Sequence, residues 1–156
     1  MKHINESIIG RRGVDYHDYQ KYELANEPIL FMGHTLYRIK ALKSIPSKNV
    51  KKGDLGGWVE SYNNLDQKGD CWVADDAYVY SNAEVSGNAK VYGNANVYGN
   101  AKVFDNAEVC GNAWVYDNAQ VYDKAKVYGD AEVCGNAKVY GSAKVNYEVN
   151  KGTVNK

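Results

Sequence analysis

Residues 77–146 read AYVYSNAEVSGNAKVYGNANVYGNAKVFDNAEVCGNAWVYDNAQVYDKAKVYGDAEVCGNAKVYGSAKVN and contain the strongest pattern in the chain. Alanine returns every six residues from Ala77 to Ala143, and valine follows two positions later each time, from Val79 to Val145. A fixed short period without insertions is typical of a solenoid, in which each unit buries its apolar side only against its neighbours.

The six-residue unit, for example AKVYGN, has the chemistry of a short strand followed by a tight corner. Alanine and valine two positions apart lie on the same side of an extended segment, so we expect both to point inward. Glycine and asparagine, which recur at the last two positions, accept left-handed backbone conformations at low cost, as a repeated corner requires. A helix is excluded because a six-residue period matches no helical repeat and the glycines would destabilise it.

This unit resembles the hexapeptide repeat of left-handed parallel β-helix proteins, which combines a large aliphatic residue, a small residue four places on and an Asn-bearing turn. In that family three six-residue units make one triangular coil of 18 residues, so the resemblance implies about four regular coils over residues 77–146. The implied fold class is all-β: a left-handed parallel β-helix, or β-solenoid, with an N-terminal β-hairpin cap. Acyltransferases, carbonic anhydrases, antifreeze proteins and binding proteins share this fold, so it does not by itself specify a function.

The segment before the repeats carries a second resemblance. It is similar to the head region of YdcK-like hexapeptide-repeat proteins of bacteria and their phages, through KYEL (21–24), GHTLYRIKAL (33–42), VKKGDLGGWVE (50–60) and NLDQKGDCWV (64–73). The resemblance to that group implies no assigned catalytic function.

This segment is predicted to cap the solenoid. PILFM and TLYRIKAL flank Gly33-His34 as a β-hairpin, and strand alternation would put Leu36, Arg38 and Lys40 on one side. Val59, Leu65, Cys71 and Ala77 continue the six-residue phase backwards, so an irregular first coil should start near Trp58. The predicted divisions are an N-terminal β-rich cap (1–57), the hexapeptide-repeat β-helix (58–150) and a C-terminal tail (151–156).

Composition limits the classes of function. The chain has 156 residues, 19 basic and 19 acidic side chains and a mean hydropathy of −0.58. No apolar run is long enough for a membrane span or a secretory signal, and zero net charge argues against a nucleic-acid partner that is bound by a strong field. Three cysteines cannot all pair within the chain, so we expect reduced thiols and a cytoplasmic protein.

No catalytic group or cofactor site is predicted. His3, His17 and His34 all precede the repeats, and the uninterrupted hexads leave no loop for a substrate clamp. A histidine base or a zinc-bound water needs several polar groups in reach of one point, so we predict no catalytic residue, no metal and no cofactor.

Two charged features leave alternatives open. Asp105 and Asp123 fall on equivalent corners one coil apart, where they could hold a cation or simply form turns. A basic run without an intervening acid could face phosphate or be a solvated edge of the cap. This run consists of Arg38, Lys40, Lys43, Lys48, Lys51 and Lys52.

The outward positions of the hexads provide the candidate binding site. Sorting them by 18 residues gives three columns, and the most aromatic face is predicted to carry Tyr78, Tyr80, Tyr98, Trp114 and Tyr116. Stacked rings along a solenoid stabilise its strands, and an aromatic face can equally form a protein-binding hot spot.

We therefore expect a non-catalytic solenoid that binds a protein partner or associates with itself. The phage-like head suggests an inhibitor of a host anti-phage defence factor. One alternative is an oligomeric acyltransferase-like enzyme or small-molecule binder with a groove between subunits, and another is a purely structural, self-assembling protein. Antifreeze activity is disfavoured because the flat threonine arrays of such proteins are missing from the repeats.

Overall fold

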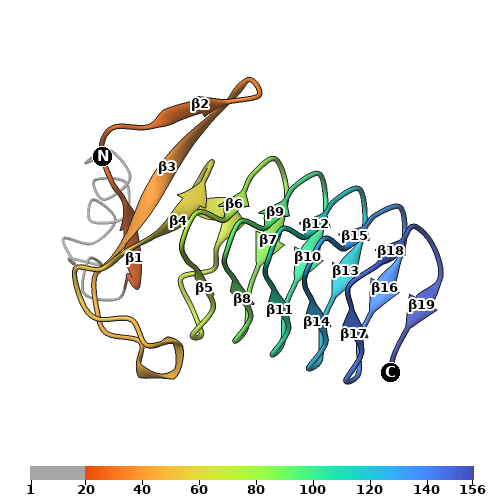
Figure 1. The fold of residues 1–156 in the computed structure, drawn as a ribbon. Coiled ribbons are helices and arrows are strands. Elements are labelled where there is room, and N and C mark those ends of the chain that lie inside the picture. Colours follow the sequence, from red (N-terminus) through yellow and green to blue (C-terminus); the bar gives the residue numbers. More distant parts are fainter. Residues whose placement is uncertain (1–19) are drawn as a thin grey trace, which may run out of the picture.

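The computed structural model describes residues 20–156, and residues 1–19 of the predicted cap, with His3 and His17, lie outside this described part. Figure 1 shows four longer strands at one end of a stack of coils. The four strands are β1 (Tyr22–Leu24), β2 (Ile29–Phe31), β3 (His34–Ala41) and β4 (Leu55–Val59). Two short 3₁₀ turns, η2 (Pro46–Lys48) and η3 (Tyr62–Asn64), follow β3 and β4.

The coils are built from two-residue strands, each made of the valine and the residue before it. They are β5 (Trp72–Val73), β6 (Tyr78–Val79), β7 (Glu84–Val85), β8 (Lys90–Val91), β9 (Asn96–Val97), β10 (Lys102–Val103), β11 (Glu108–Val109), β12 (Trp114–Val115), β13 (Gln120–Val121), β14 (Lys126–Val127), β15 (Glu132–Val133), β16 (Lys138–Val139), β17 (Lys144–Val145), β18 (Glu148–Val149) and β19 (Thr153–Val154).

These strands form the three sides of a parallel β-solenoid. One side runs β4-β6-β9-β12-β15-β18, the second β7-β10-β13-β16-β19 and the third β5-β8-β11-β14-β17. In the regular coils each residue pairs with the one 18 positions later, as Val103 does with Val121. The predicted fold class, an all-β parallel β-helix with a β-hairpin cap, is confirmed.

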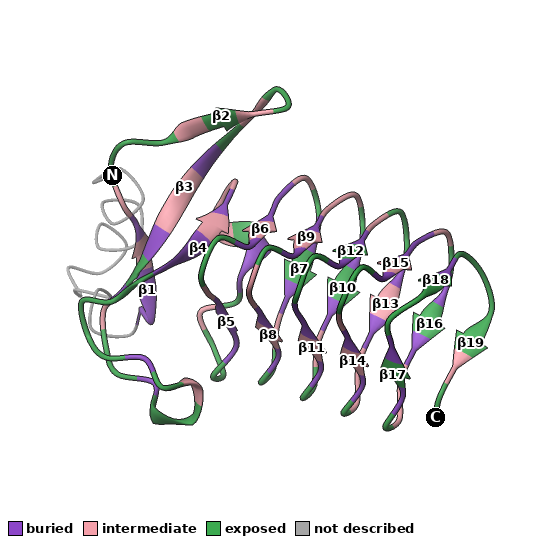
Figure 2. Ribbon diagram, viewed as in Figure 1, coloured by how far each residue is buried: buried purple, intermediate pink, exposed green. Residues whose placement is uncertain are grey.

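The core is a column of alanine and valine. The alanine and the valine of each hexad are at most 1% exposed. Figure 2 shows this alternation of buried and exposed positions along the ribbon. Burying a valine side chain contributes about 1.5–3 kcal/mol, so repetition of this pair supplies the main stabilisation of the coils.

The corners need residues that accept a left-handed backbone. Gly99 has a φ of 68°, and Asp117, one coil later on the same edge, has a φ of 58°. A Cβ atom added at Gly99 would lie 2.9 Å from the backbone nitrogen of Asp117, so successive corners pack backbone against backbone. Glycine fits this contact and this φ without strain.

The corner aspartates act as turn residues. Asp105 and Asp123 have φ values of 56° and 57°. Oδ2 of Asp105 accepts the N–H of Asp123 at 3.2 Å, and Oδ2 of Asp123 accepts the N–H of Gly141 at 2.9 Å. Residues 20–156 contain no group of three or more His, Cys, Asp or Glu that could hold a metal ion. The turn-forming alternative accounts for both carboxylates.

The first coil is out of phase with the rest, which corrects the sequence prediction. Val59 pairs with Val79, and Leu65 forms a bridge with Val85, so both fill valine positions rather than the predicted alanine positions. Cys71 returns to the alanine position because the next residue, Trp72, pairs with Lys90. The two extra residues that restore the phase lie between Leu65 and Cys71.

The cap supplies hydrogen-bond donors that a preceding coil would otherwise provide. In the regular stack, Ala89 O accepts the N–H of Trp72, and Gly87 O accepts the N–H of Cys71. One coil earlier, the equivalent carbonyls of Cys71 and Gly69 accept from the buried Lys21 Nζ, at 2.7 and 3.1 Å. Burial lowers the pKa of Lys21, and the nearby Cys71 opposes this shift.

Two further cap residues complete this end of the solenoid. The Tyr22 hydroxyl donates to Leu65 O at 2.5 Å. The fully buried Asn64 donates from Nδ2 to Ser81 O at 3.1 Å and to Ala83 O at 2.9 Å. Buried backbone carbonyls are costly when unpaired, so these side chains explain why polar groups lie under the cap.

The predicted hairpin is present and leans over the solenoid. β2 pairs with β3 in antiparallel fashion, with Phe31 opposite His34. Its two-residue loop is Met32–Gly33, with φ values of 49° and 81°, as a primed hairpin turn requires.

A β-bulge changes which residues of β3 face inward. The register of β3 against β4 shifts between Arg38 and Lys40. Consequently Leu36 and Ile39 are buried whereas Lys40 is exposed, so the predicted alignment of Leu36, Arg38 and Lys40 on one side is wrong. The Arg38 guanidinium instead lies 4.6 Å from the Trp58 ring centroid.

The solenoid continues to the C-terminal end in a shortened coil. Val149 pairs with Val133, and Val154 pairs with Val139, so the spacing falls below the regular 18 residues. The segment 151–156, predicted as a tail, therefore contains β19. Among residues 20–156, no helix has the length and apolar character that a membrane span needs.

Replacing Lys21 with Met tests the capping role. The variant K21M leaves the carbonyls of Cys71 and Gly69 without a donor, so we expect the free energy of unfolding to fall by about 2–4 kcal/mol. Urea denaturation followed by circular dichroism measures this loss. The matched variant K138M removes an exposed lysine and should change stability by less than about 0.5 kcal/mol. Equal stability of K21M and K138M would contradict the capping role.

Candidate partner-binding surface

The five residues predicted as a binding site do share one side of the solenoid, around β6, β9 and β12. Tyr80, Tyr98 and Tyr116 stack as parallel rings, with centroids 5.1 and 5.0 Å apart. The ring of Trp114 meets the edge of Tyr98 at 6.4 Å. We call the outward side chains of β6, β9, β12, β15 and β18, with the residues that follow each valine, the aromatic face.

The hairpin divides this face into a covered and an open part. Phe31 packs edge-on against Tyr78 at 4.6 Å and against Tyr80 at 5.7 Å. His34 lies 4.9 Å from the Tyr80 ring. Tyr80 is consequently only 5% exposed, so a partner cannot reach it while the hairpin is in place.

A polar clamp holds the hairpin in this position. His34 Nδ1 lies 3.0 Å from Glu60 Oε2, and Glu60 Oε1 accepts the N–H of Ser81 at 2.8 Å. These contacts join β3 to the corner that follows β6. The hairpin therefore forms a fixed wall at the N-terminal end of the aromatic face.

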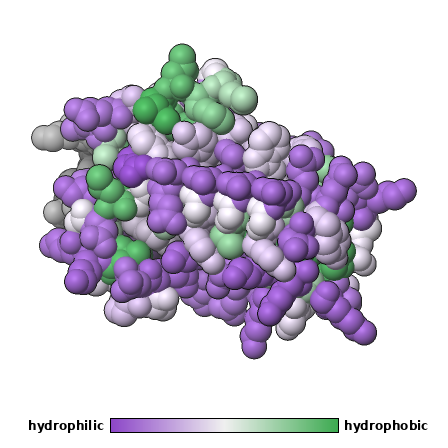
Figure 3. Space-filling view, viewed as in Figure 1, coloured by the Kyte–Doolittle hydropathy of each residue, from purple (hydrophilic) through white to green (hydrophobic). Residues whose placement is uncertain are grey.

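Beyond the wall, large apolar side chains remain exposed. Leu30 and Met32 at the hairpin tip are 77% and 79% exposed, and Trp114 is 43% exposed. Figure 3 shows a hydrophobic patch where Figure 1 draws the β2–β3 hairpin. Exposed apolar groups gathered in this way are typical of interaction surfaces. We call Leu30, Met32, Tyr98, Trp114 and Tyr116 the open surface.

The other end of the aromatic face is acidic. Glu132 and Glu148 are cross-strand neighbours on β15 and β18, directly after Trp114 in the same column. The Tyr116 hydroxyl donates to Glu132 Oε1 at 3.0 Å. The open surface thus changes from apolar at the hairpin to acidic toward the C-terminal end.

Stacked rings are not special to this side. Phe104, Tyr122 and Tyr140 stack on the second side with centroids 4.9 and 5.1 Å apart. Stacking by itself therefore fits a stabilising role. The exposed Trp114 and the hairpin wall distinguish the aromatic face.

Tyrosine acidity reflects the packing of this face. Burial raises the pKa of Tyr80 to about 12, and the neighbouring Tyr98 and Glu60 act in the same direction. The pKa of Tyr98 is raised chiefly by burial. The pKa of Tyr116 is raised first by its hydrogen bond to Cys134 and then by burial.

The sequence prediction found the floor of the open surface and missed its wall. Leu30, Phe31 and Met32 were assigned only to a capping hairpin. Their signal was present, because Ile29–Met32 is the longest apolar run of the chain, which is unusual in an exposed hairpin. Of the predicted five, Tyr78 and Tyr80 serve as the seat of the hairpin.

Comparison with known proteins finds no family model that matches this sequence and no similar curated protein. The candidate site is therefore interpreted from its own geometry.

Alkaline titration tests the packing of the tyrosine stack. Because the folded pKa of Tyr80 is raised above its ordinary value of 10, the folded state holds this proton longer than the unfolded chain does. Its contribution to stability is complete below pH 10 and is lost as the pH rises toward 12, by about 2–3 kcal/mol at most. Urea unfolding at a series of pH values measures the decline.

The variant Y80F is the control for this titration, because it keeps the ring and removes the ionisable hydroxyl. It should show a shallower decline of stability above pH 10. Identical slopes for Y80F and the unchanged chain would show that Tyr80 does not titrate as its burial implies.

Proposed function

We propose that this chain is a non-catalytic β-solenoid that binds a protein partner through the open surface. The observation that carries the proposal is the placement of Leu30, Met32 and Trp114, all exposed, around the stacked rings of Tyr98 and Tyr116. Protein-binding hot spots are enriched in tryptophan and tyrosine, and they need a rigid support. The hydrogen-bonded coils and the His34–Glu60–Ser81 clamp provide that support.

The charge pattern defines the kind of partner segment. An apolar side chain of the partner fits between the hairpin wall and the Trp114 ring. A basic side chain fits beyond it, where Trp114 offers a ring face and Glu132 and Glu148 offer carboxylates. We therefore propose a partner that presents an apolar residue followed by an arginine or lysine.

The biological setting comes from the resemblance of the head region to bacterial and phage hexapeptide-repeat proteins. In that setting the partner would be a host factor, and binding would inhibit it, for example a component of an anti-phage defence system. A rigid solenoid that occupies a functional surface can inhibit without any chemistry of its own.

Substitutions in the open surface test the proposal. The variant W114S, and separately L30S/M32S, should reduce partner capture from a lysate of the native host at least about tenfold, because hot-spot residues contribute 2 kcal/mol or more. Quantitative affinity capture with mass spectrometry measures the loss. Tyr98 is left unchanged because it lies in the middle of the stack and its removal would also weaken the fold.

The matched control is Y122S, which removes a stacked tyrosine from the second side. It should capture the same protein as the unchanged chain. A partner retained by W114S and L30S/M32S would refute the site. Native mass spectrometry of the purified chain adds a second check, since an oligomer that W114S dissociates would assign the surface to self-association instead.

A further inference from the structure

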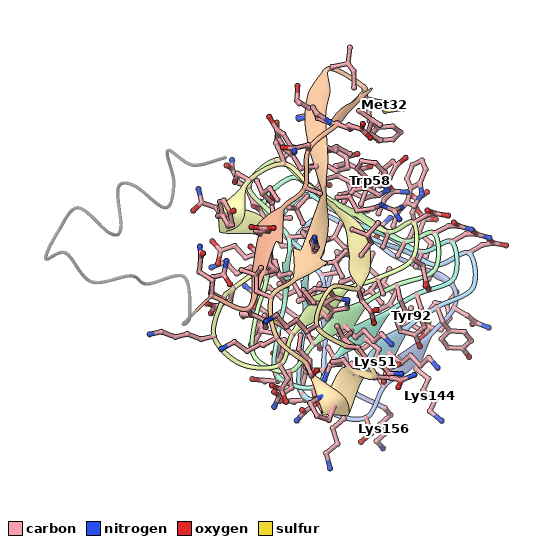
Figure 4. All side chains as sticks on the ribbon, turned by 90° about the vertical axis from the view of Figure 1, so that its left-hand side faces the viewer. Met32, Lys51, Trp58, Tyr92, Lys144 and Lys156 are labelled. Atoms are coloured by element: carbon pink, nitrogen blue, oxygen red, sulfur yellow. The ribbon has the colours of Figure 1, made fainter. Side chains whose placement is uncertain are left out.

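A second site lies away from the open surface, where the loop that follows β3 overhangs the third side of the solenoid. The loop is tied to the first coil by the Ser47 hydroxyl, which donates to Asp70 Oδ2 at 2.8 Å. Between η2 and the strands β8 and β11 lies a cleft of about 440 Å³. Figure 4 shows Lys51, Tyr92 and Lys144 on the side of the molecule away from Met32.

The lining of this cleft is polar and carries uncompensated positive charge. Lys48 and Asn49 line it from the loop, and Asn88, Lys90 and Tyr92 line it from the solenoid. Lys90 Nζ lies 4.8 Å from the Tyr92 ring centroid. Within residues 20–156, neither Lys48 nor Lys90 has a carboxylate within ion-pair distance.

The single carboxylate on the cleft wall is already engaged. Glu108 Oε1 accepts the hydroxyl of Tyr92 at 2.9 Å. Along the same column, Glu108 is followed by Lys126 and Lys144, which are direct cross-strand neighbours. Like charges at this spacing destabilise a sheet, and an anion bound beside them relieves the repulsion.

We propose that this cleft binds a small phosphorylated molecule of about nucleotide size. Its volume falls within the range of small-molecule sites, about 300–1,000 Å³, and its polar lining excludes an apolar ligand. Two lysines that approach from opposite walls suit a phosphate group, which accepts charge-assisted hydrogen bonds from both. The side-chain amides of Asn49 and Asn88 can bond the hydroxyl or base edges of the remainder.

This inference is independent of the proposed partner surface. The open surface is formed by the hairpin tip and β9 and β12, whereas the cleft is formed by η2, β8 and β11. Loss of one activity therefore leaves the other measurable in the same protein.

Isothermal titration calorimetry tests the cleft, with pyrophosphate, ADP and adenosine as probes. We expect pyrophosphate and ADP to bind, adenosine not to bind, and affinity to fall between about 0.05 M and 0.5 M salt. Tighter binding of ADP than of pyrophosphate would identify a nucleotide, and equal binding would identify inorganic polyphosphate. The variant K48Q/K90Q should weaken binding at least about tenfold, the effect of losing charge-assisted bonds.

The control variant K138Q removes an exposed lysine from the second side and should bind the probes like the unchanged chain. The proposal is overturned by the absence of binding at millimolar probe, by unchanged affinity in K48Q/K90Q, or by an equal loss in K138Q, which would indicate general charge attraction. It is also overturned if a single-stranded oligonucleotide binds more tightly than ADP and this binding depends on Lys126 and Lys144 instead. Circular dichroism of each variant checks that the coils remain folded.

Discussion

The structure depends on hydrogen bonds between successive coils. Each regular coil satisfies carbonyls of the next, as Trp72 does for Ala89 and Lys90 does for Ala107. A stack of this kind cannot begin without a substitute for the missing coil, because unpaired buried carbonyls are costly. Lys21 and Tyr22 provide that substitute. The cap is thus a condition of the solenoid, and the hairpin that forms part of it also builds the wall of the open surface.

The same ladder explains why chemistry is sorted by side. A residue that recurs every 18 positions stands directly above its equivalent, so a column of tyrosines becomes a ring stack and a column of lysines becomes a basic row. The alanine and valine positions are fixed by the core, and only the outward positions are free to vary. One solenoid can therefore carry an aromatic side and a lysine-rich side without any change to its fold.

Most of the fold could be predicted because the hexad period repeats in every coil and in each case agrees with the turn chemistry. The irregular ends could not be predicted. The phase of Val59 and Leu65 depends on where two extra residues are accommodated, and the burial of Ile39 depends on a bulge that strand alternation does not reveal. The floor of the open surface followed from column arithmetic. Its wall did not, because the contact of Phe31 with Tyr78 joins segments that no local pattern connects.

The central claim is that the hairpin tip and Trp114 form one protein-binding surface on a rigid support. Site-specific photo-crosslinking in the native host tests it most directly, with the crosslinking side chain placed at position 32 in one protein and at position 122 in another. We expect position 32 to crosslink one defined protein that position 122 does not. No product at position 32, or the same products at both positions, would contradict the account.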